Sequence, residues 1–178
     1  MQSLDAIVWE MDARTWRFTF VSDRAEQLMG YPVRRWLEEE GFSQQVLLHP
    51  EDRDWAVDFC VTATGEARDH EFLYRTRAAD RRIVWLKDLV RVVRDEAGAA
   101  RLLRGVTVDV TREKEAEACR AEMSQILERI TDAFYAVDRE RRFIYVNRQA
   151  ERDLRRSAPE LLGRCIWDEF PKARDAAS

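Results

Sequence analysis

The chain opens with two short apolar stretches, residues 6–11 (AIVWEM) and 16–21 (WRFTFV), which are separated by the largely polar residues 12–15 (DART). Aromatic and β-branched residues of this kind favour strands, and a short polar connection between them suits a hairpin. We therefore predict an antiparallel pair of strands at the start of the chain.

Helical spacing follows this hairpin. Residues 24–29 and 33–40 are short segments whose apolar positions lie on one side of a helix, and Pro50 precedes a longer segment of the same kind at 51–64. Proline is well tolerated in the first turn of a helix. The pattern therefore predicts two short helices and then a longer one.

The period then changes from helical to alternating. Residues 72–76, 84–93 and 102–110 each read as a strand, and polar turns separate them. Strands at both ends with helices grouped between them favour an α+β fold with an antiparallel sheet over alternating βαβ units. We expect this domain to close near Thr111.

Beyond Thr111 the pattern is helical and highly charged, with a narrow apolar stripe. Its members are spaced three and four residues apart, as in a coiled-coil seam: Ala116, Cys119, Met123, Ile126 and Ile130. This stripe favours a parallel homodimer formed through the helix after Thr111. The alternative, in which the helix folds back on its own sheet, stays open.

Composition and charge exclude several classes of protein. The 178 residues include 30 Lys and Arg and 34 Asp and Glu, so the net charge is −4 and we expect no nucleic-acid partner. No apolar run approaches the length of a membrane-spanning helix, and the first residues do not resemble a signal peptide. Three widely spaced cysteines predict neither a zinc site nor a disulfide framework. We expect a cytoplasmic chain without direct membrane insertion.

The beginning of the chain recurs after this helix. The two related stretches are LDAIVWEMDARTWRFTFVSDRAE and TDAFYAVDRERRFIYVNRQAE. Val21 and Val146 align 125 residues apart, and the first copy has two more residues, which we place in its hairpin. A repeat at this distance predicts tandem domains. We divide the chain into a domain at 1–111, a linker helix at 112–131 and the front part of a second domain at 132–178.

The second copy has too few residues to close a core alone. We therefore expect the residues beyond about Ala133 to be poorly ordered, or to borrow packing from a neighbouring chain. The sequence resembles a piece of a longer protein.

Four phrases, in the same order as in the family, resemble the PAS sensory domain with its PAC segment: FTFVSDRAEQLMGY, HPEDRD, HEFLYRTRAADRRIVWLKDLVRVVRDEAG and LLRGVTVDVTREKEAE. The resemblance covers one complete copy and the front of a second. It implies a five-stranded antiparallel sheet with short helices on one face. It also implies that the last strand leads into a signalling helix through a junction, Asp109-Val110-Thr111, whose functional residues are Asp109 and Thr111.

Similarity to this family implies a sensory and dimerisation module of a bacterial signal-transduction protein. The expected partner is a downstream output domain in the same protein, a histidine kinase of a two-component system. A serine phosphatase or a cyclic-dinucleotide enzyme fits the sequence as well. A constitutive dimerisation scaffold without a ligand is the rival from another class. We find no catalytic residues and no metal ligands, so we predict that this part of the protein is not an enzyme.

The aromatic residues indicate a core or a ligand pocket. The candidate pocket residues are Trp9, Phe20, Trp36, Trp55, Phe59, Phe72, Tyr74 and Trp85. We place Arg75, Arg77 and Lys87 on the exposed face of the sheet, opposite Phe72, Tyr74 and Trp85.

The cofactor stays unknown, and the sequence favours none. Light-sensing flavin relatives carry an Asn-Cys-Arg-Phe phrase that is absent here, and Cys60 reads as a buried small apolar residue. A flavin held without a covalent bond is left open. Haem-binding relatives use a His within the long middle helix, whereas His49 precedes that helix as a loop or capping residue. We expect His70 to begin a strand and face solvent, which argues against haem.

Overall fold

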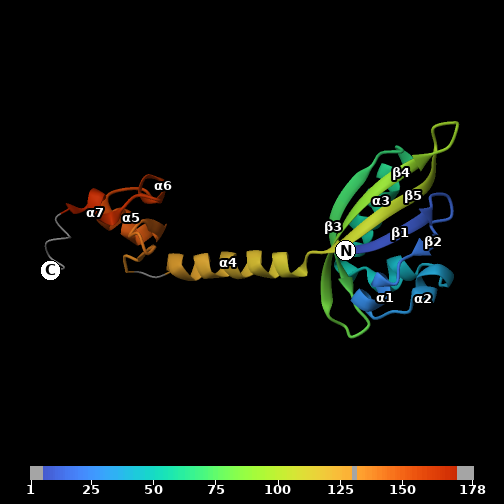
Figure 1. The fold of residues 1–178 in the computed structure, drawn as a ribbon, viewed down its shortest axis with the longest axis horizontal. Helices are drawn as coiled ribbons and strands as arrows, with labels where there is room; N and C mark the ends of the chain where they lie inside the picture. Colours follow the sequence, from blue (N-terminus) through green and yellow to red (C-terminus); the bar gives the residue numbers. More distant parts are fainter. Residues whose placement is uncertain (1–5, 130–131, 172–178) are drawn as a thin grey trace. The chain divides into compact units, whose positions relative to one another are not determined.

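The computed structural model describes residues 6–129 and 132–171, which form two compact units divided within a helix, after Glu115. The first unit contains nine elements: β1 (Ala6–Asp12), β2 (Phe18–Val21), α1 (Arg24–Met29), α2 (Val33–Glu38), the π-helix η1 (Ser43–Leu47), α3 (Pro50–Gly65), β3 (His70–Arg77), β4 (Ile83–Arg94) and β5 (Ala100–Asp109) (Figure 1). The strands form one antiparallel sheet in the order β2-β1-β5-β4-β3. The predicted α+β fold with a five-stranded antiparallel sheet is confirmed.

Two details of the first unit differ from the sequence expectation. Strand β2 begins at Phe18, because Trp16 lies in the preceding turn with a positive φ of 57°. The π-helix η1 was not expected, since five residues are too few to show a period. Short π-helical turns are frequent at functional sites.

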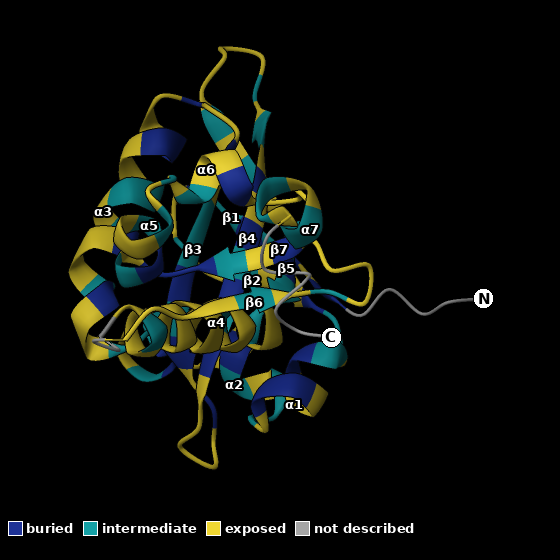
Figure 2. Cartoon of the chain, turned by 90° about the vertical axis from the view of Figure 1, so that its left-hand side faces the viewer, coloured by how far each residue is buried: buried dark blue, intermediate teal, exposed yellow. Residues whose placement is uncertain are grey.

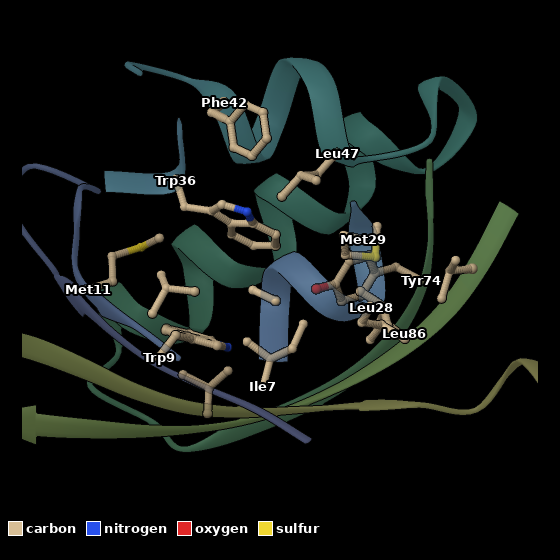
Figure 3. Packing of buried hydrophobic residues seen from close by; sticks show 14 of the residues in the cluster. Ile7, Trp9, Met11, Leu28, Met29, Trp36, Phe42, Leu47, Tyr74 and Leu86 are labelled. Atoms are coloured by element: carbon tan, nitrogen blue, oxygen red, sulfur yellow. The ribbon is translucent and has the colours of Figure 1, made fainter. Parts of the chain in front are cut away.

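One face of the sheet is buried under the helices. Alternate residues of β1 (Ile7, Trp9, Met11) are buried, whereas Val8 between them is 39% exposed. The helical side contributes Met29, Trp36, Phe42 and Leu47 to the same cluster. Figure 3 shows Trp36 and Phe42 on the helical side of this cluster and Trp9 and Ile7 on the strand side. The core therefore lies between the sheet and one layer of helices.

Gly105 allows Trp9 to lie flat on the sheet. The two residues are paired across β1 and β5, and a Cβ at position 105 would lie 2.0 Å from Trp9 Cε2. Any larger residue would therefore displace the indole ring.

The opposite face of the sheet carries charged residues together with the aromatic residues Phe20 and Trp85. Trp85 is paired with Arg75 across β4 and β3, and the Arg75 guanidinium lies 5.7 Å from the Trp85 ring centroid. The prediction that Trp85 shares a face with Phe72 and Tyr74 is therefore wrong. Val84 and Leu86 occupy the buried positions on either side of it, so a shift of one residue in reading the period reverses the face.

Arg75 also fastens the start of α3 to the edge strand β3. Its backbone N–H donates to Asp52 Oδ2 at 2.7 Å, and its guanidinium donates to both Asp52 oxygens at 2.5 and 3.0 Å. Hydrogen bonds from Arg75 lower the pKa of Asp52 to about 2. The His49 side chain caps α3 by accepting from the N–H of Glu51 at 3.3 Å.

Helix α4 (Thr111–Arg129) follows β5 after the single residue Val110. Most of its residues are exposed, as the yellow ribbon in Figure 2 shows. Met123 and Ile126 of the apolar stripe are 55% and 53% exposed. In the described structure the stripe is therefore available for contact.

The second unit contains the hairpin of β6 (Tyr135–Val137) and β7 (Phe143–Val146), followed by three short helices: α5 (Arg148–Leu154), α6 (Ala158–Leu161) and α7 (Ile166–Glu169). Four residues form a small buried cluster: Phe143, Val146, Ala150 and Leu161. The expectation that residues beyond about Ala133 are poorly ordered or borrow packing is corrected for residues 134–171, because they form these elements around a cluster of their own.

Candidate functional site

A cavity of about 110 Å³ lies between the buried face of the sheet and the helices of the first unit. Its walls are largely apolar and include Ile7, Met11, Leu47 and Leu86. Polar side chains also line it, among them Ser43 and Gln44 of the π-helix η1. An apolar cavity with a few polar groups is the usual form of a small-molecule site.

The structure places half of the predicted pocket residues at this cavity. Those that line it are Trp9, Trp36, Phe72 and Tyr74. The other four do not: Phe20, Trp55, Phe59 and Trp85.

The four residues that lie elsewhere are on other surfaces of the first unit. Trp85 is on the outer face of the sheet beside Arg75. Phe20 is 52% exposed on the edge strand β2, and Trp55 is 43% exposed on α3. Phe59 packs beside Phe72, with ring centroids 5.6 Å apart, outside the cavity lining. Conversely, Trp16 and Phe18 line the cavity. Aromatic character alone did not distinguish the face on which each ring lies.

A chain of hydrogen bonds crosses the sheet side of the cavity. The Trp9 indole N–H donates to Thr107 Oγ1 at 2.8 Å, and the Thr107 hydroxyl in turn donates to Asp88 Oδ1. From the other side the Tyr74 hydroxyl donates to Asp88 Oδ2 at 2.9 Å. All four residues line the cavity. The buried carboxylate is held in place by Thr107 of β5 and Tyr74 of β3, and Trp9 of β1 bonds to Thr107.

The sequence reading missed Asp88, although the signal was present. In β4 the buried positions alternate as Val84, Leu86, Asp88 and Val90. A carboxylate on the buried face of a period-two strand is costly unless it is bonded, and such groups often mark functional sites.

Burial changes the acid–base behaviour of this cluster. Asp88 is only 6% exposed, and its desolvation raises its pKa to about 6, despite the opposing hydrogen bonds from Thr107 and Tyr74. Desolvation, together with the nearby Asp88, also raises the pKa of Tyr74 well above its usual value. In the described part of the chain no Lys or Arg forms an ion pair with Asp88.

Cys60 and His70 lie beside this cluster. Cys60 Sγ lines the cavity and is 3.4 Å from His70 Nε2, and burial raises the pKa of the thiol to about 12. His70 begins β3 as expected, but it is 7% exposed, so the prediction that it faces solvent is wrong. Its Nδ1 is 3.0 Å from the Arg68 carbonyl oxygen, so neighbours already occupy both ring nitrogens.

The cavity does not fit the large cofactors of the family. Pockets that enclose drug-sized molecules span roughly 300–1,000 Å³, well above the 110 Å³ found here. Neither His49 nor His70 lines the cavity, so no imidazole is placed to hold a haem iron. Within the described residues no cluster of His, Cys, Asp and Glu could hold a metal ion.

The predicted signal junction joins the sheet to α4 through a compact set of bonds. Asp109 Oδ1 accepts from the Thr111 N–H at 2.9 Å and from the Thr111 hydroxyl at 2.5 Å. Thr111 Oγ1 accepts from the Trp85 backbone N–H at 3.0 Å, and the Val110 N–H donates to the Trp85 carbonyl at 2.9 Å. The first residue of α4 is therefore bonded to β4 as well as to the end of β5.

The predicted dimer seam is only partly described. Ala116, Cys119, Met123 and Ile126 are exposed on α4, whereas Ile130 lies outside the described residues. None of the helices described in the structure is long and apolar enough to cross a membrane.

Comparison with known proteins gives the context of this geometry. Family models described as "PAS fold" match residues 18–107 and again residues 121–177. A curated relative, the sensor protein FixL of Bradyrhizobium diazoefficiens, is 26% identical over 134 residues; these cover 73% of this chain but only 26% of that protein. The chain thus spans about a quarter of the length of this relative.

Two solved structures illustrate the likeness. The N-terminal domain of a diguanylate cyclase with PAS/PAC sensor from Marinobacter aquaeolei is 36% identical, with a TM-score of 0.57; the match covers 61% of this chain and 98% of that one. A sensory box histidine kinase/response regulator from Burkholderia thailandensis is 20% identical, with a TM-score of 0.55, over 69% of this chain and 91% of that one. The latter shows a shared fold. With a five-stranded sheet and a matching family model over half of its length, this chain belongs to the PAS family, and the front of a second PAS copy follows the first.

Proposed function

We propose that this chain is a non-catalytic sensory and dimerisation module of a bacterial signal-transduction protein. A change in the cavity passes through Asp109-Val110-Thr111 to α4 and from there to a downstream output domain. The observation that carries this proposal is the bond from the Trp85 N–H to Thr111 Oγ1 at 3.0 Å.

That bond links the cavity to the helix through two short stretches of strand. On β4, Trp85 is three residues from Asp88, and on β5, Asp109 is two residues from Thr107. Asp88 and Thr107 line the cavity, whereas Trp85 and Asp109 bond to Thr111. Any shift of β4 against β5 at the cavity therefore reaches the start of α4 directly, and a packed sheet transmits such a shift because it has little room to absorb it.

The second part of the proposal is that two copies of the chain pair through α4. The exposed stripe of Ala116, Cys119, Met123 and Ile126 has coiled-coil spacing. Size measurement by light scattering tests this directly. Ile126→Glu should convert the dimer to a monomer, whereas Gln125→Glu, next to it and outside the stripe, should leave it a dimer. A monomeric parent chain would refute the seam.

For the output we propose a histidine kinase, in line with the sensor protein FixL and the sensory box histidine kinase among the similar proteins. A cyclic-dinucleotide enzyme is the second candidate, because the 36% identical relative is the sensor domain of a diguanylate cyclase. Incubation of the whole parent protein with ATP or with GTP distinguishes a phosphorylated histidine from a cyclic dinucleotide product.

The junction is tested by Thr111→Val in the whole parent protein. This variant removes the two bonds of the Thr111 hydroxyl, to the Trp85 N–H and to Asp109 Oδ1, and it keeps the bond from the Thr111 backbone N–H to Asp109. The side-chain volume is nearly unchanged, and we expect altered output with a small loss of thermal stability. Leu103→Ala, at a fully buried position of the preceding strand β5, serves as the control for stability lost through the core. If Thr111→Val lowers the melting temperature as much as Leu103→Ala, the junction is structural only.

Two rival functions make different predictions for the purified protein. A constitutive scaffold would dimerise identically under every condition and show no thermal shift with small molecules. A flavin sensor would be yellow. The sensory proposal predicts a thermal shift with a ligand small enough for the cavity.

A further inference from the structure

The cavity of the first unit combines three features that together select a ligand. A buried carboxylate, Asp88, lies at the sheet side without a cationic partner in the described residues. Aromatic rings line the walls, including Trp9, Phe18 and Trp36. The third feature is an unpartnered polar group on the helical side.

That group is the indole N–H of Trp36. The residue is 7% exposed and lines the cavity, and its Nε1 atom is buried without a hydrogen-bond partner. A buried donor left unpaired destabilises the protein, since it has lost its bond to water. Figure 3 shows the Trp36 ring on the helical side and the Trp9 ring on the sheet side of the cluster. An acceptor supplied by a ligand would satisfy this donor.

The aromatic rings that line the cavity pack against one another. Trp9 and Phe18 meet edge to face at 5.6 Å, and Phe18 and Trp36 at 5.8 Å. Phe72 and Tyr74 stack at 5.0 Å on the β3 side. The faces of aromatic rings attract organic cations, and a nearby carboxylate strengthens that attraction in a site with little water.

Asp88 still has acceptor capacity for such a cation. Oδ1 accepts a hydrogen bond from Thr107 and Oδ2 accepts one from Tyr74, whereas a carboxylate oxygen has two lone pairs. A protonated amine can therefore add a charge-assisted bond without displacing either neighbour.

We propose that this cavity binds a compact protonated amine that also carries an oxygen acceptor, such as a small amino alcohol. Its ammonium group donates to Asp88, its apolar body lies among Trp9, Phe18 and Phe72, and its oxygen accepts from Trp36 Nε1. The volume of about 110 Å³ limits the ligand to a few non-hydrogen atoms. This inference rests on the proposed sensory function and names the chemistry that its cavity reads.

Three five-carbon probes of similar size test the proposal by calorimetry on the whole chain. Valinol carries both groups, isoamylammonium carries only the cation, and isoamyl alcohol carries only the oxygen. We expect valinol to bind most tightly, isoamylammonium next and isoamyl alcohol weakest. Equal affinity for the ammonium and the alcohol, or no binding of any probe, would overturn the proposal.

Two variants assign the contacts. Asp88→Asn should weaken the binding of valinol at least tenfold and leave the binding of isoamyl alcohol unchanged. Asp54→Asn, which removes an exposed carboxylate of α3, should change the binding of neither probe. Trp36→Phe should lower the affinity for valinol to that for isoamylammonium. The affinity for isoamylammonium itself should stay the same. If Asp88→Asn binds valinol as well as the parent chain does, the cation site is refuted.

Two different measurements test this inference and the proposed function. Calorimetry measures occupation of the cavity, whereas Thr111→Val measures transmission to the output. If the amines fail to bind while Thr111→Val still alters output, the ligand chemistry is wrong and the sensory role stands. If valinol binds and no junction variant changes output, the transmission is wrong instead.

Discussion

The two PAS copies have nearly the same local structure but very different surroundings. In both hairpins the strand pairing shifts at the same place, between Glu10 and Met11 in the first copy and between Ala136 and Val137 in the second. In the first copy the N–H of Asp12 donates to Arg17 O, and in the second the N–H of Asp138 donates to Arg142 O. The first turn is therefore longer by one residue, not by the two we predicted.

The helix that follows the hairpin repeats in the same detail. The carboxylate of Glu26 accepts from the N–H of Val33 at 3.2 Å, and Glu151 accepts from Ala158 at 2.5 Å. These contacts all lie between Trp9 and Val33 in the first copy and between Tyr135 and Ala158 in the second, and they form whether or not the rest of the sheet is present.

Burial differs where local structure does not. Trp9 and Met11 are 7% and 8% exposed, whereas Tyr135 and Val137, at the corresponding strand positions, are 44% and 37% exposed. In the first copy β5 pairs beside β1, and in the described residues of the second copy β6 has only β7 as a neighbour. The comparison separates what a short segment determines alone from what needs the whole sheet.

The largest expected effect concerns a contact that only the first copy has. Gly105→Ala would place a Cβ 2.0 Å from the Trp9 ring, and we expect it to lower the free energy of unfolding of the first unit by about 3 kcal/mol. Denaturant unfolding with hydrogen exchange on both units measures this. Gly65→Ala, where nothing lies within 4 Å, is the control. Equal loss of protection in the second unit would contradict the separation.

The buried charge of the first copy gives the next effect. Burial raises the pKa of Asp88 to about 6, so its carboxyl binds a proton more tightly in the folded than in the unfolded state. Stability should therefore fall as pH rises from about 4 through 6. The titratable groups that face it, Tyr74 of β3 and Cys60 of α3, have raised pKa values and stay neutral over this range.

Asp88→Asn removes this dependence. We expect the variant to be more stable than the parent chain by about 2 kcal/mol at pH 8, with little difference at pH 4. Thermal unfolding at both values measures it. A parent chain whose stability rises between pH 4 and 7 relative to the variant would contradict the raised pKa.

The third prediction compares equivalent side chains at the hairpin base. Asn147 accepts from the Phe134 and Ala150 N–H groups and donates to the Asp132 carbonyl. Ser22 accepts from the Val8 N–H at 3.0 Å. We expect Asn147→Ala to destabilise the second unit by about 2 kcal/mol and Ser22→Ala to destabilise the first by about 1. Exchange of the Phe134 and Val8 amides reports each loss, and equal effects would refute the assignment.

The smallest effect lies at the end of the first helix in each copy. Gly30 and Arg155 both adopt left-handed backbone, with φ of 73° and 55°, and their N–H groups bond to Glu26 O and Glu151 O. Glycine adopts this conformation without the strain of a Cβ. Arg155→Gly should therefore stabilise the second unit by up to about 1 kcal/mol, whereas Gly30→Ala should destabilise the first. A shift of either melting temperature in the other direction would contradict this.

Much of the fold could be predicted because its signals are periodic or repeated. The alternation in β3, β4 and β5 and the recurrence near Val146 identify the sheet and the second copy from residue order alone. The residues of the candidate site were harder to predict. Phe20 and Trp9 are both strand aromatics, but they lie on opposite faces of the sheet because Phe20 pairs with Glu10 and Trp9 pairs with Val21 across β1 and β2. His70 is buried because Phe72 and Phe59 pack against it, contacts that no single stretch of sequence contains.

Asp88 shows a different limit of prediction from the sequence. Its place in the alternation was visible, but the reason that a carboxylate is tolerated there was not. Thr107 and Tyr74 come from two other strands, so the cluster exists only once the register of three strands is set. Polar side chains at predicted buried positions therefore merit examination before the aromatic residues around them.

The single neighbour of β6 has a consequence for any measurement of assembly. Within the described residues one side of this strand carries backbone amide and carbonyl groups without a partner strand, and such an edge accepts strands from other molecules. Two copies can therefore associate in a way that has nothing to do with α4. A dimer that is abolished by Ile126→Glu forms through α4. A dimer that persists in this variant, and whose fraction rises with protein concentration, forms through the exposed edge of β6.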